Sequence, residues 1–215
     1  MNAFVFKSSA LIALALAAVP ASAVTIAVAN ASFETLPAGG LTFGCGTGCS
    51  FSTGAVPGWV TTGATGQFQP GSAGFYNFVP DGLTVAYING GSIMQTVAPT
   101  AVAGSTYTLT TAFGVRNDLG NPGSIRLLVG FNTVFATGIV PTFGNWSTYT
   151  ASYTATLADV GGAISIELVS PGPQGGFDNV VLTSAAVPEP GTWALMFAGF
   201  GMVGYAARRR AALVA

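Results

Sequence analysis

The sequence predicts an all-β fold, either an antiparallel sandwich or a barrel, and three observations support this. Short runs rich in Thr, Val, Ile and Tyr recur along the chain, with Gly, Pro and Asn at the breaks between them. No amphipathic helical stretch occurs between residues 24 and 186. The turns between the runs are short, as is typical of antiparallel sandwiches and barrels.

The expected strands follow from alternating, β-branched segments. They cover residues 24–28, 83–89, 92–97, 106–116, 124–131, 133–140, 146–156, 163–170 and 177–183. Gly90-Gly91 separates two of these segments and is a signal for a two-residue hairpin. Residues 36–58, which are rich in Gly, Ser, Thr and Pro, are expected to form a long loop.

Charge is scarce in this chain. Charged residues make up 6% of its 215 residues, against roughly 25% in an average soluble domain. Between residues 24 and 187 the two basic residues, Arg116 and Arg126, are outnumbered by six acidic ones. This balance excludes a basic nucleic-acid-binding surface. Histidine is absent, which removes the most common general base and transition-metal ligand.

Residues 1–23 have the pattern of a secretory signal peptide, which would form an N-terminal signal helix. Lys7 supplies the positive charge, residues 10–19 are apolar, and Ala21-Ser22-Ala23 is a small-residue cleavage site. A transmembrane anchor is the alternative, but ~10 apolar residues are too few to cross a bilayer. We therefore expect export from the cytoplasm and a mature chain that begins at Val24.

Cys45 and Cys49 are the only cysteines and lie in the long loop. After export to an oxidising compartment, two thiols this close are expected to form a disulfide. The small ring would rigidify the tip of the loop more than it would stabilise the fold. A metal-binding pair is the alternative, but such a site needs two more ligands and no histidine can supply them.

The C-terminal segment, residues 187–215, has three parts in a fixed order. A rigid proline-containing tripeptide comes first, an uncharged apolar run over residues 193–207 follows, and three arginines close it. The residues that form this motif are Pro188, Glu189, Pro190, Trp193, Arg208, Arg209 and Arg210. The order resembles the PEP-CTERM sorting signal of bacterial surface proteins.

This resemblance implies that an exosortase recognises the chain. Residues 193–207 would form a transmembrane helix in the inner membrane, with the arginines on the cytoplasmic side. Its ~22 Å length is short for a ~30 Å hydrocarbon core. Cleavage near the motif would then release the domain to the cell surface or extracellular matrix. A single-pass anchor that is never cut is the alternative.

Short motifs in the body resemble galactose-binding-like jelly rolls. They are Asn30-Ala31-Ser32-Phe33-Glu34 with Pro57-Gly58-Trp59, then Ile93 to Leu109, and finally Phe177-Asp178-Asn179-Val180-Val181-Leu182. The resemblance implies a jelly-roll-like β-sandwich over residues 24–186. It also implies a structural calcium ion held by Glu34 and Asp178, a donor set that suits this cation. The alternative is that both carboxylates cap turns or accept backbone N–H groups.

For function, we expect a non-enzymatic surface or matrix protein with a structural or adhesive role. The alternative is a carbohydrate-binding module that recognises exopolysaccharide through exposed aromatic rings. Its main candidate residues are Trp59, Tyr76, Arg116 and Trp146, with Phe75, Tyr87 and Asn117 as further possibilities. Core packing of the aromatic residues and a salt bridge from Arg116 to Asp118 are the simpler interpretations. A glycoside hydrolase, which needs a carboxylate pair, ranks last; its acids would come from Asp81, Asp118, Asp159 and Glu167.

Overall fold

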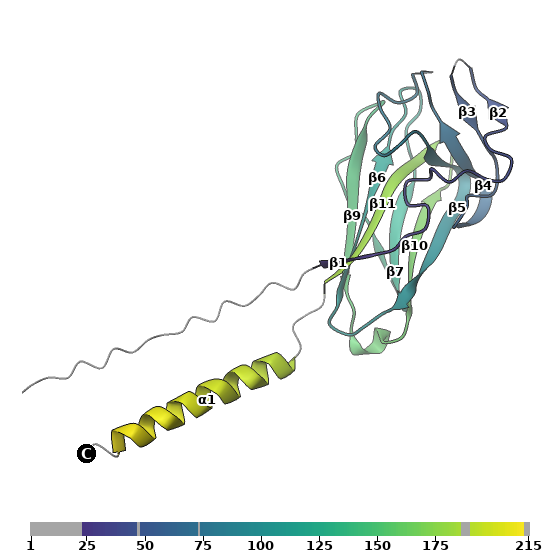
Figure 1. Ribbon diagram of the computed structural model, residues 1–215. Coiled ribbons are helices and arrows are strands. Elements are labelled where there is room, and N and C mark those ends of the chain that lie inside the picture. Colours follow the sequence, from purple (N-terminus) through teal and green to yellow (C-terminus); the bar gives the residue numbers. More distant parts are fainter. Residues whose placement is uncertain (1–22, 47, 73, 186–189, 213–215) are drawn as a thin grey trace, which may run out of the picture.

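The structure is a computed structural model that describes residues 23–46, 48–72, 74–185 and 190–212. It confirms the all-β prediction: eleven antiparallel strands form a sandwich of two layers (Figure 1). The predicted signal peptide up to residue 22, together with Pro188 and Glu189 of the sorting motif, lies outside the described residues.

The first layer contains most of the strands. In spatial order these are β2 (Phe43–Gly44), β3 (Ser50–Phe51), β4 (Val60–Gln69), β5 (Val85–Thr100), β10 (Ala163–Ser170), β7 (Ser124–Val129) and β8 (Asn132–Phe135). The second layer contains β1 (Ala23–Ile26), β11 (Gly175–Ala185), β6 (Thr106–Gly114) and β9 (Trp146–Thr154). The first residues of β11 also pair with β5 and so join the two layers at one end.

The main core lies between the layers and follows the alternation of the strands. Every second residue of β7 is buried, and β6 alternates in the same way over most of its length. The side chains of Ile93, Leu109, Leu127, Ile166 and Leu182 are fully buried in this core. Burial of such side chains contributes roughly 1.5–3 kcal/mol each to folding, so the inward faces predicted by the period of two hold the sandwich together.

The predicted hairpin at Gly90-Gly91 is wrong, because both glycines lie inside the continuous strand β5. A Cβ atom on Gly91 would lie 2.0 Å from the carbonyl oxygen of Thr62, and one on Gly63 would lie 2.2 Å from that of Gly90. The glycines therefore allow a close approach between β4 and β5. At this point β5 changes partner, since Ile88 pairs with β11 and Gly91 with β10.

The segment before β5 is more ordered than predicted. The expected long loop includes the short strands β2 and β3, and β4 occupies residues to which no strand was assigned. Gly66 explains the weak signal of β4: a Cβ atom there would lie 2.0 Å from the carbonyl oxygen of Ser52. Close packing of backbones thus requires glycine where strand propensity disfavours it.

In the described part of the chain, one α-helix, α1 (Pro190–Ala212), follows the last strand. No helix among the described residues is both long enough and apolar enough to cross a membrane. The transmembrane helix predicted over residues 193–207 is therefore not confirmed.

Candidate functional site

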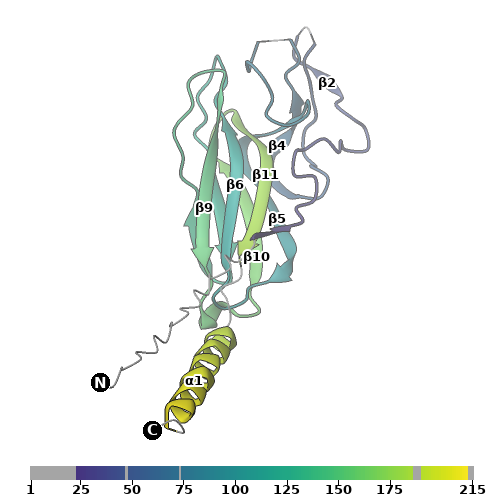
Figure 2. The same cartoon turned by 60° about the vertical axis from the view of Figure 1, so that its left-hand side comes forward.

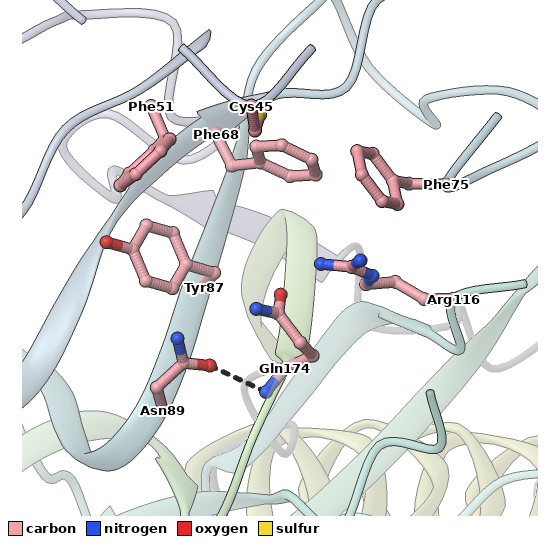
Figure 3. Close-up of a pocket in the computed structure, with 8 residues that line it drawn as sticks. All are labelled: Cys45, Phe51, Phe68, Phe75, Tyr87, Asn89, Arg116 and Gln174. Atoms are coloured by element: carbon pink, nitrogen blue, oxygen red, sulfur yellow. Dashed lines mark hydrogen bonds between the residues drawn. The ribbon is translucent and has the colours of Figure 1, made fainter. Parts of the chain in front are cut away.

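A pocket of about 150 Å³ lies against β3, β4 and β5. Alternation along β5 turns Ala86 and Ile88 into the main core, whereas Tyr87 and Asn89 point to the other face of the sheet, where the pocket is (Figure 3). The residues that line it are Cys45, Phe51, Phe68, Phe75, Tyr87, Asn89, Arg116 and Gln174. Four aromatic rings and one cation thus surround a small space.

Arg116 is the only charged residue among those that line the pocket. Its guanidinium carbon lies 4.0 Å from the centroid of the Phe75 ring and 6.0 Å from that of Phe68, which is the geometry of a cation–π interaction. Its Nε and Nη2 atoms donate to Oδ1 and Oδ2 of Asp118 at 2.8 and 2.6 Å. The hydrogen bonds from Arg116 lower the pKa of Asp118, so this carboxylate stays ionised at neutral pH.

The loop that carries Arg116 is tied to the loop that carries Phe75. Asn117 donates its backbone N–H to the Phe75 carbonyl at 2.9 Å and its side-chain amide to the Gly74 carbonyl at 2.7 Å. The cation and the ring are therefore held in place by backbone contacts as well as by each other.

Polar groups complete the pocket at the β5 and β11 side. The Gln174 N–H donates to Oδ1 of Asn89 at 2.6 Å, and the Gln174 side chain points into the pocket (Figure 3). Gln174 has a φ of 65°, which residues other than glycine rarely adopt. Tyr87 donates its hydroxyl to the Ser52 carbonyl at 2.8 Å, and burial raises the pKa of Tyr87. The phenol is thus a fixed, neutral part of the wall.

The predicted disulfide between Cys45 and Cys49 is present. Cys45 contributes to the wall of the pocket, and Cys49 is buried in the small aromatic cluster behind it. The bridge therefore holds one side of the pocket, a role that its position in a glycine-rich loop did not reveal.

The structure separates the aromatic residues that were predicted to bind a ligand. Trp59 belongs to the main core, where its ring lies 5.5 Å from that of Phe33. Tyr76 and Trp146 pack together at 4.6 Å in the cluster behind the pocket. Burial raises the pKa of Tyr76, so it too stays neutral. Of the four main candidates for ligand binding, only Arg116 lines the pocket.

Sequence reasoning missed Phe51, Phe68, Asn89 and Gln174 as members of this site. Phe51 and Phe68 lie on the two strands, β3 and β4, that the sequence did not predict. A usable sequence signal for β4 was the polar–apolar alternation of Gln67, Phe68 and Gln69. Gln174 comes next to Asn89 only through pairing between β5 and β11.

Glu34 and Asp178 both face the loop that precedes β5. Oε1 of Glu34 accepts the N–H groups of Leu83 and Thr84 at 2.9 and 2.7 Å. Oδ2 of Asp178 accepts the Asp81 N–H at 3.0 Å, and its Oδ1 accepts the N–H of the next residue at 2.7 Å. These are the contacts of the alternative that the sequence left open, in which both carboxylates accept backbone N–H groups.

No cluster of three or more His, Cys, Asp or Glu side chains suited to a metal occurs among the described residues. Calcium binding by Glu34 and Asp178 stays a prediction. Asp178 is fully buried, and burial raises its pKa to about 7 despite the two N–H donors.

Two families match the chain. The HpiC1 cyclase family matches residues 24–183, and the PEP-CTERM protein-sorting motif matches residues 186–210. The second match confirms the sorting motif predicted from the sequence. No curated protein matches the chain.

Solved structures with the same fold include cyclases from Fischerella sp. TAU. One, in complex with (3Z)-3-(1-methyl-2-pyrrolidinylidene)-3H-indole, is 26% identical, with a TM-score of 0.63 over 77% of this chain and 100% of that chain. Another, in complex with 4-(1H-indol-3-yl)butan-2-one, is 25% identical, with a TM-score of 0.62 over 77% and 100%. A xylan-binding domain from Paenibacillus barcinonensis is 11% identical, with a TM-score of 0.43 over 80% and 100%.

Proposed function

The chain belongs to the HpiC1-like cyclase family, and from this premise we propose that its sandwich is a surface-displayed binding domain that holds a small planar ligand without transforming it. The PEP-CTERM motif marks the chain as an exported, membrane-anchored precursor that is processed by an exosortase. The observation that carries the proposal is the pocket in which a buried arginine lies over the ring of Phe75, with the ring of Phe68 nearby.

A flat conjugated ring suits this pocket in three ways. The rings of Phe51, Phe68 and Phe75 offer stacking partners for a second π system. The Arg116 guanidinium offers a positive charge to the face of such a ring, and the side-chain amide of Gln174 offers a hydrogen bond at its edge. The similar cyclase structures from Fischerella sp. TAU hold compounds with an indole ring, so an indole is the rational first probe.

The groups that line the pocket support binding without turnover. None of the eight lining residues is a carboxylic acid or a histidine, and the one charged group among them is the guanidinium of Arg116. A proton donor or acceptor with a pKa near neutrality is what general acid–base catalysis requires. The proposed role is therefore binding, not catalysis.

Exopolysaccharide recognition is less well supported than a small planar ligand. A module that binds a polysaccharide needs several ring faces open to solvent, but Trp59 and Tyr76 are each only 8% exposed. Glycoside hydrolysis has still less support, because three of the four candidate acids serve structural roles. Asp118 and Glu167 are paired with arginines, and Asp159 caps the 3₁₀ helix η1 (Leu157–Asp159).

An acid-catalysed cyclase is the second candidate, and one observation besides the family favours it. Asp178 is a buried carboxyl group whose pKa is raised to about 7, a value suited to a general acid at neutral pH. Asp178 is not among the residues that line the pocket, so we place this candidate second. Liquid chromatography with mass spectrometry of an indole substrate incubated with the chain distinguishes the two, since a cyclase forms an isomer of new retention time that the Asp178→Asn variant does not form.

Titration calorimetry with 4-(1H-indol-3-yl)butan-2-one tests the binding proposal. We expect saturable 1:1 binding to the exported chain and none of galactose at equal concentration. Binding of galactose alone would support the carbohydrate-binding alternative, and binding of neither compound would contradict a planar ligand of this type.

We also propose that cleavage near the sorting motif releases the domain to the cell surface or matrix. The Pro188→Ala/Pro190→Ala variant tests it, because these prolines stiffen the segment that an exosortase would recognise. We expect the variant to keep its C-terminal segment and the wild type to lose it. Exported forms of equal mass would support an anchor that is never cut.

A further inference from the structure

We propose that the end of the sandwich that carries η1 is a membrane-docking surface, which rests on the phospholipid bilayer while the precursor is anchored. Four apolar side chains at this end are exposed: Val102 at 58%, Phe131 completely, Leu157 at 87% and Val160 at 59%. Each lies outside the strands, Leu157 in η1 and the other three in loops, so none of them takes part in strand pairing.

Hydrogen bonds join the three loops that carry these side chains into one surface. Ala101 donates its N–H to the Gly162 carbonyl at 2.8 Å, and Gly161 donates to the Ala101 carbonyl at 2.9 Å. Gly130, which precedes Phe131, donates to the Ala163 carbonyl at 2.9 Å. The loops after β5, β7 and β9 are therefore fixed side by side, and their apolar tips form a single patch.

The position of the sorting motif identifies the bilayer as the occupant. β11 ends at Ala185, which pairs with Thr106 at the start of β6, and Thr106 pairs with Thr154 at the end of β9. The chain thus leaves the sandwich beside this patch. The sorting motif begins at residue 186, and the five peptide steps from Ala185 to α1 span at most ~18 Å. Figure 2 shows η1, the short green helix, at the end next to which α1 begins.

The electrostatics of this end also suit a lipid surface. Its one carboxylate in the described loops, Asp159, is only 3% exposed. The oxygens of Asp159 accept hydrogen bonds from Asn132, Tyr153 and Thr156, and these bonds lower its pKa. The surface therefore presents apolar side chains with no exposed charge from these loops, as segments that insert at the membrane interface do.

A fluorescent probe on single cysteines measures the contact. The two native cysteines form a disulfide, so Phe131→Cys or Leu157→Cys supplies one free thiol for an environment-sensitive NBD label. Leu83→Cys is the matched control, because Leu83 is 69% exposed and precedes β5, whereas Val102 follows it at the other end. The full chain is reconstituted in phosphatidylethanolamine/phosphatidylglycerol vesicles, with and without lipids that carry a quencher.

We expect labels at residues 131 and 157 to be quenched at a depth of roughly 5–10 Å in the interface, and the label at residue 83 to stay in water. If the chains float with the vesicles but all three labels are equally exposed to water, the docking surface is refuted and membrane anchoring is not. Chains that do not float with the vesicles would overturn membrane anchoring as well. Shielding that appears without lipid would assign the patch to α1 or to a second copy, and would likewise refute the proposal.

Discussion

The guanidinium carbon of Arg116 lies 4.0 Å from the centroid of the Phe75 ring. The same guanidinium donates two hydrogen bonds to the carboxylate of Asp118, which is the more exposed partner. The arginine side chain is only 10% exposed and that of its carboxylate partner is 49% exposed. One face of the cation is thus oriented in advance toward the pocket, and little entropy is lost when a ligand stacks there.

Replacement of Arg116 by glutamine tests this relationship. Loss of the cation removes stacking worth ~0.5–2 kcal/mol, so the affinity for an indole ligand should fall about tenfold. Calorimetric titration measures it.

Arg126→Gln is the matched control for that experiment. Arg126 also lies over a ring, 5.1 Å from the centroid of Phe135, and also pairs with a carboxylate, Glu167, at 3.1 Å. It does not line the pocket, so ligand affinity should be unchanged. Equal losses in both variants would show that the effect is one of general stability.

The buried Asp178 carboxyl makes stability depend on pH. Its pKa is raised from 3.8 to about 7 by burial, so the folded chain binds a proton more tightly than the unfolded chain does. This contribution is complete below about pH 4 and is lost as the pH rises to about 7, on the order of 4 kcal/mol at most. Asp178→Asn should flatten the profile of unfolding free energy over this interval, measured by denaturant titration. A profile as steep as that of the wild type would assign the dependence to other groups.

Gly114 supports the Trp146 ring directly. A Cβ atom at this position would lie 2.5 Å from the indole ring, and Trp146 in turn packs on Tyr76 behind the pocket. Gly114→Ala should lower the unfolding free energy by about 1–3 kcal/mol through overpacking. Gly120→Ala is the control, since nothing lies within 4 Å of its Cβ position. Equal thermal melts for the two variants would contradict this role.

The disulfide should matter more to the pocket than to global stability. Its ring closes a loop of only a few residues, which limits its contribution to about 2 kcal/mol. Cys45 forms part of the pocket wall, so Cys45→Ser/Cys49→Ser should weaken indole binding while the melting temperature falls only slightly. A large fall in melting temperature with unchanged affinity would reverse this assignment. Reduced wild type provides the comparison.

Chelation tests the calcium prediction. Backbone N–H groups occupy Oε1 of Glu34 and both oxygens of Asp178, so we expect the melting temperature to be the same with and without EDTA. A clear decrease that added Ca²⁺ reverses would show that a cation binds there after all.

Local patterns in the chain were sufficient for most of the sheet. β10 was predicted with its observed bounds, and β6, β7, β9 and β11 within about three residues, because their apolar and polar side chains alternate. β4 was missed because Gly63 and Gly66 occupy it, and each is required by a backbone that approaches from a distant part of the chain. Glycines at these positions interrupt the alternation of apolar and polar side chains from which a strand is predicted.

The candidate site shows the same division. Two features of the site join residues that are close in sequence: the ion pair of Arg116 with Asp118 and the Cys45–Cys49 bridge. The sequence was therefore enough to predict them. Phe68, Tyr87 and Gln174 come together only through the pairing of β4, β5 and β11.

By itself, the sequence determined the all-β class, the sorting motif and the scarcity of charge, since each is a property of composition or of neighbouring residues. Only the tertiary structure decided which aromatic rings pack in the core, as Trp59 does, and which line a pocket. The physical reason is that an aromatic side chain gains free energy from burial in either place. Strand register over long sequence separations selects the place.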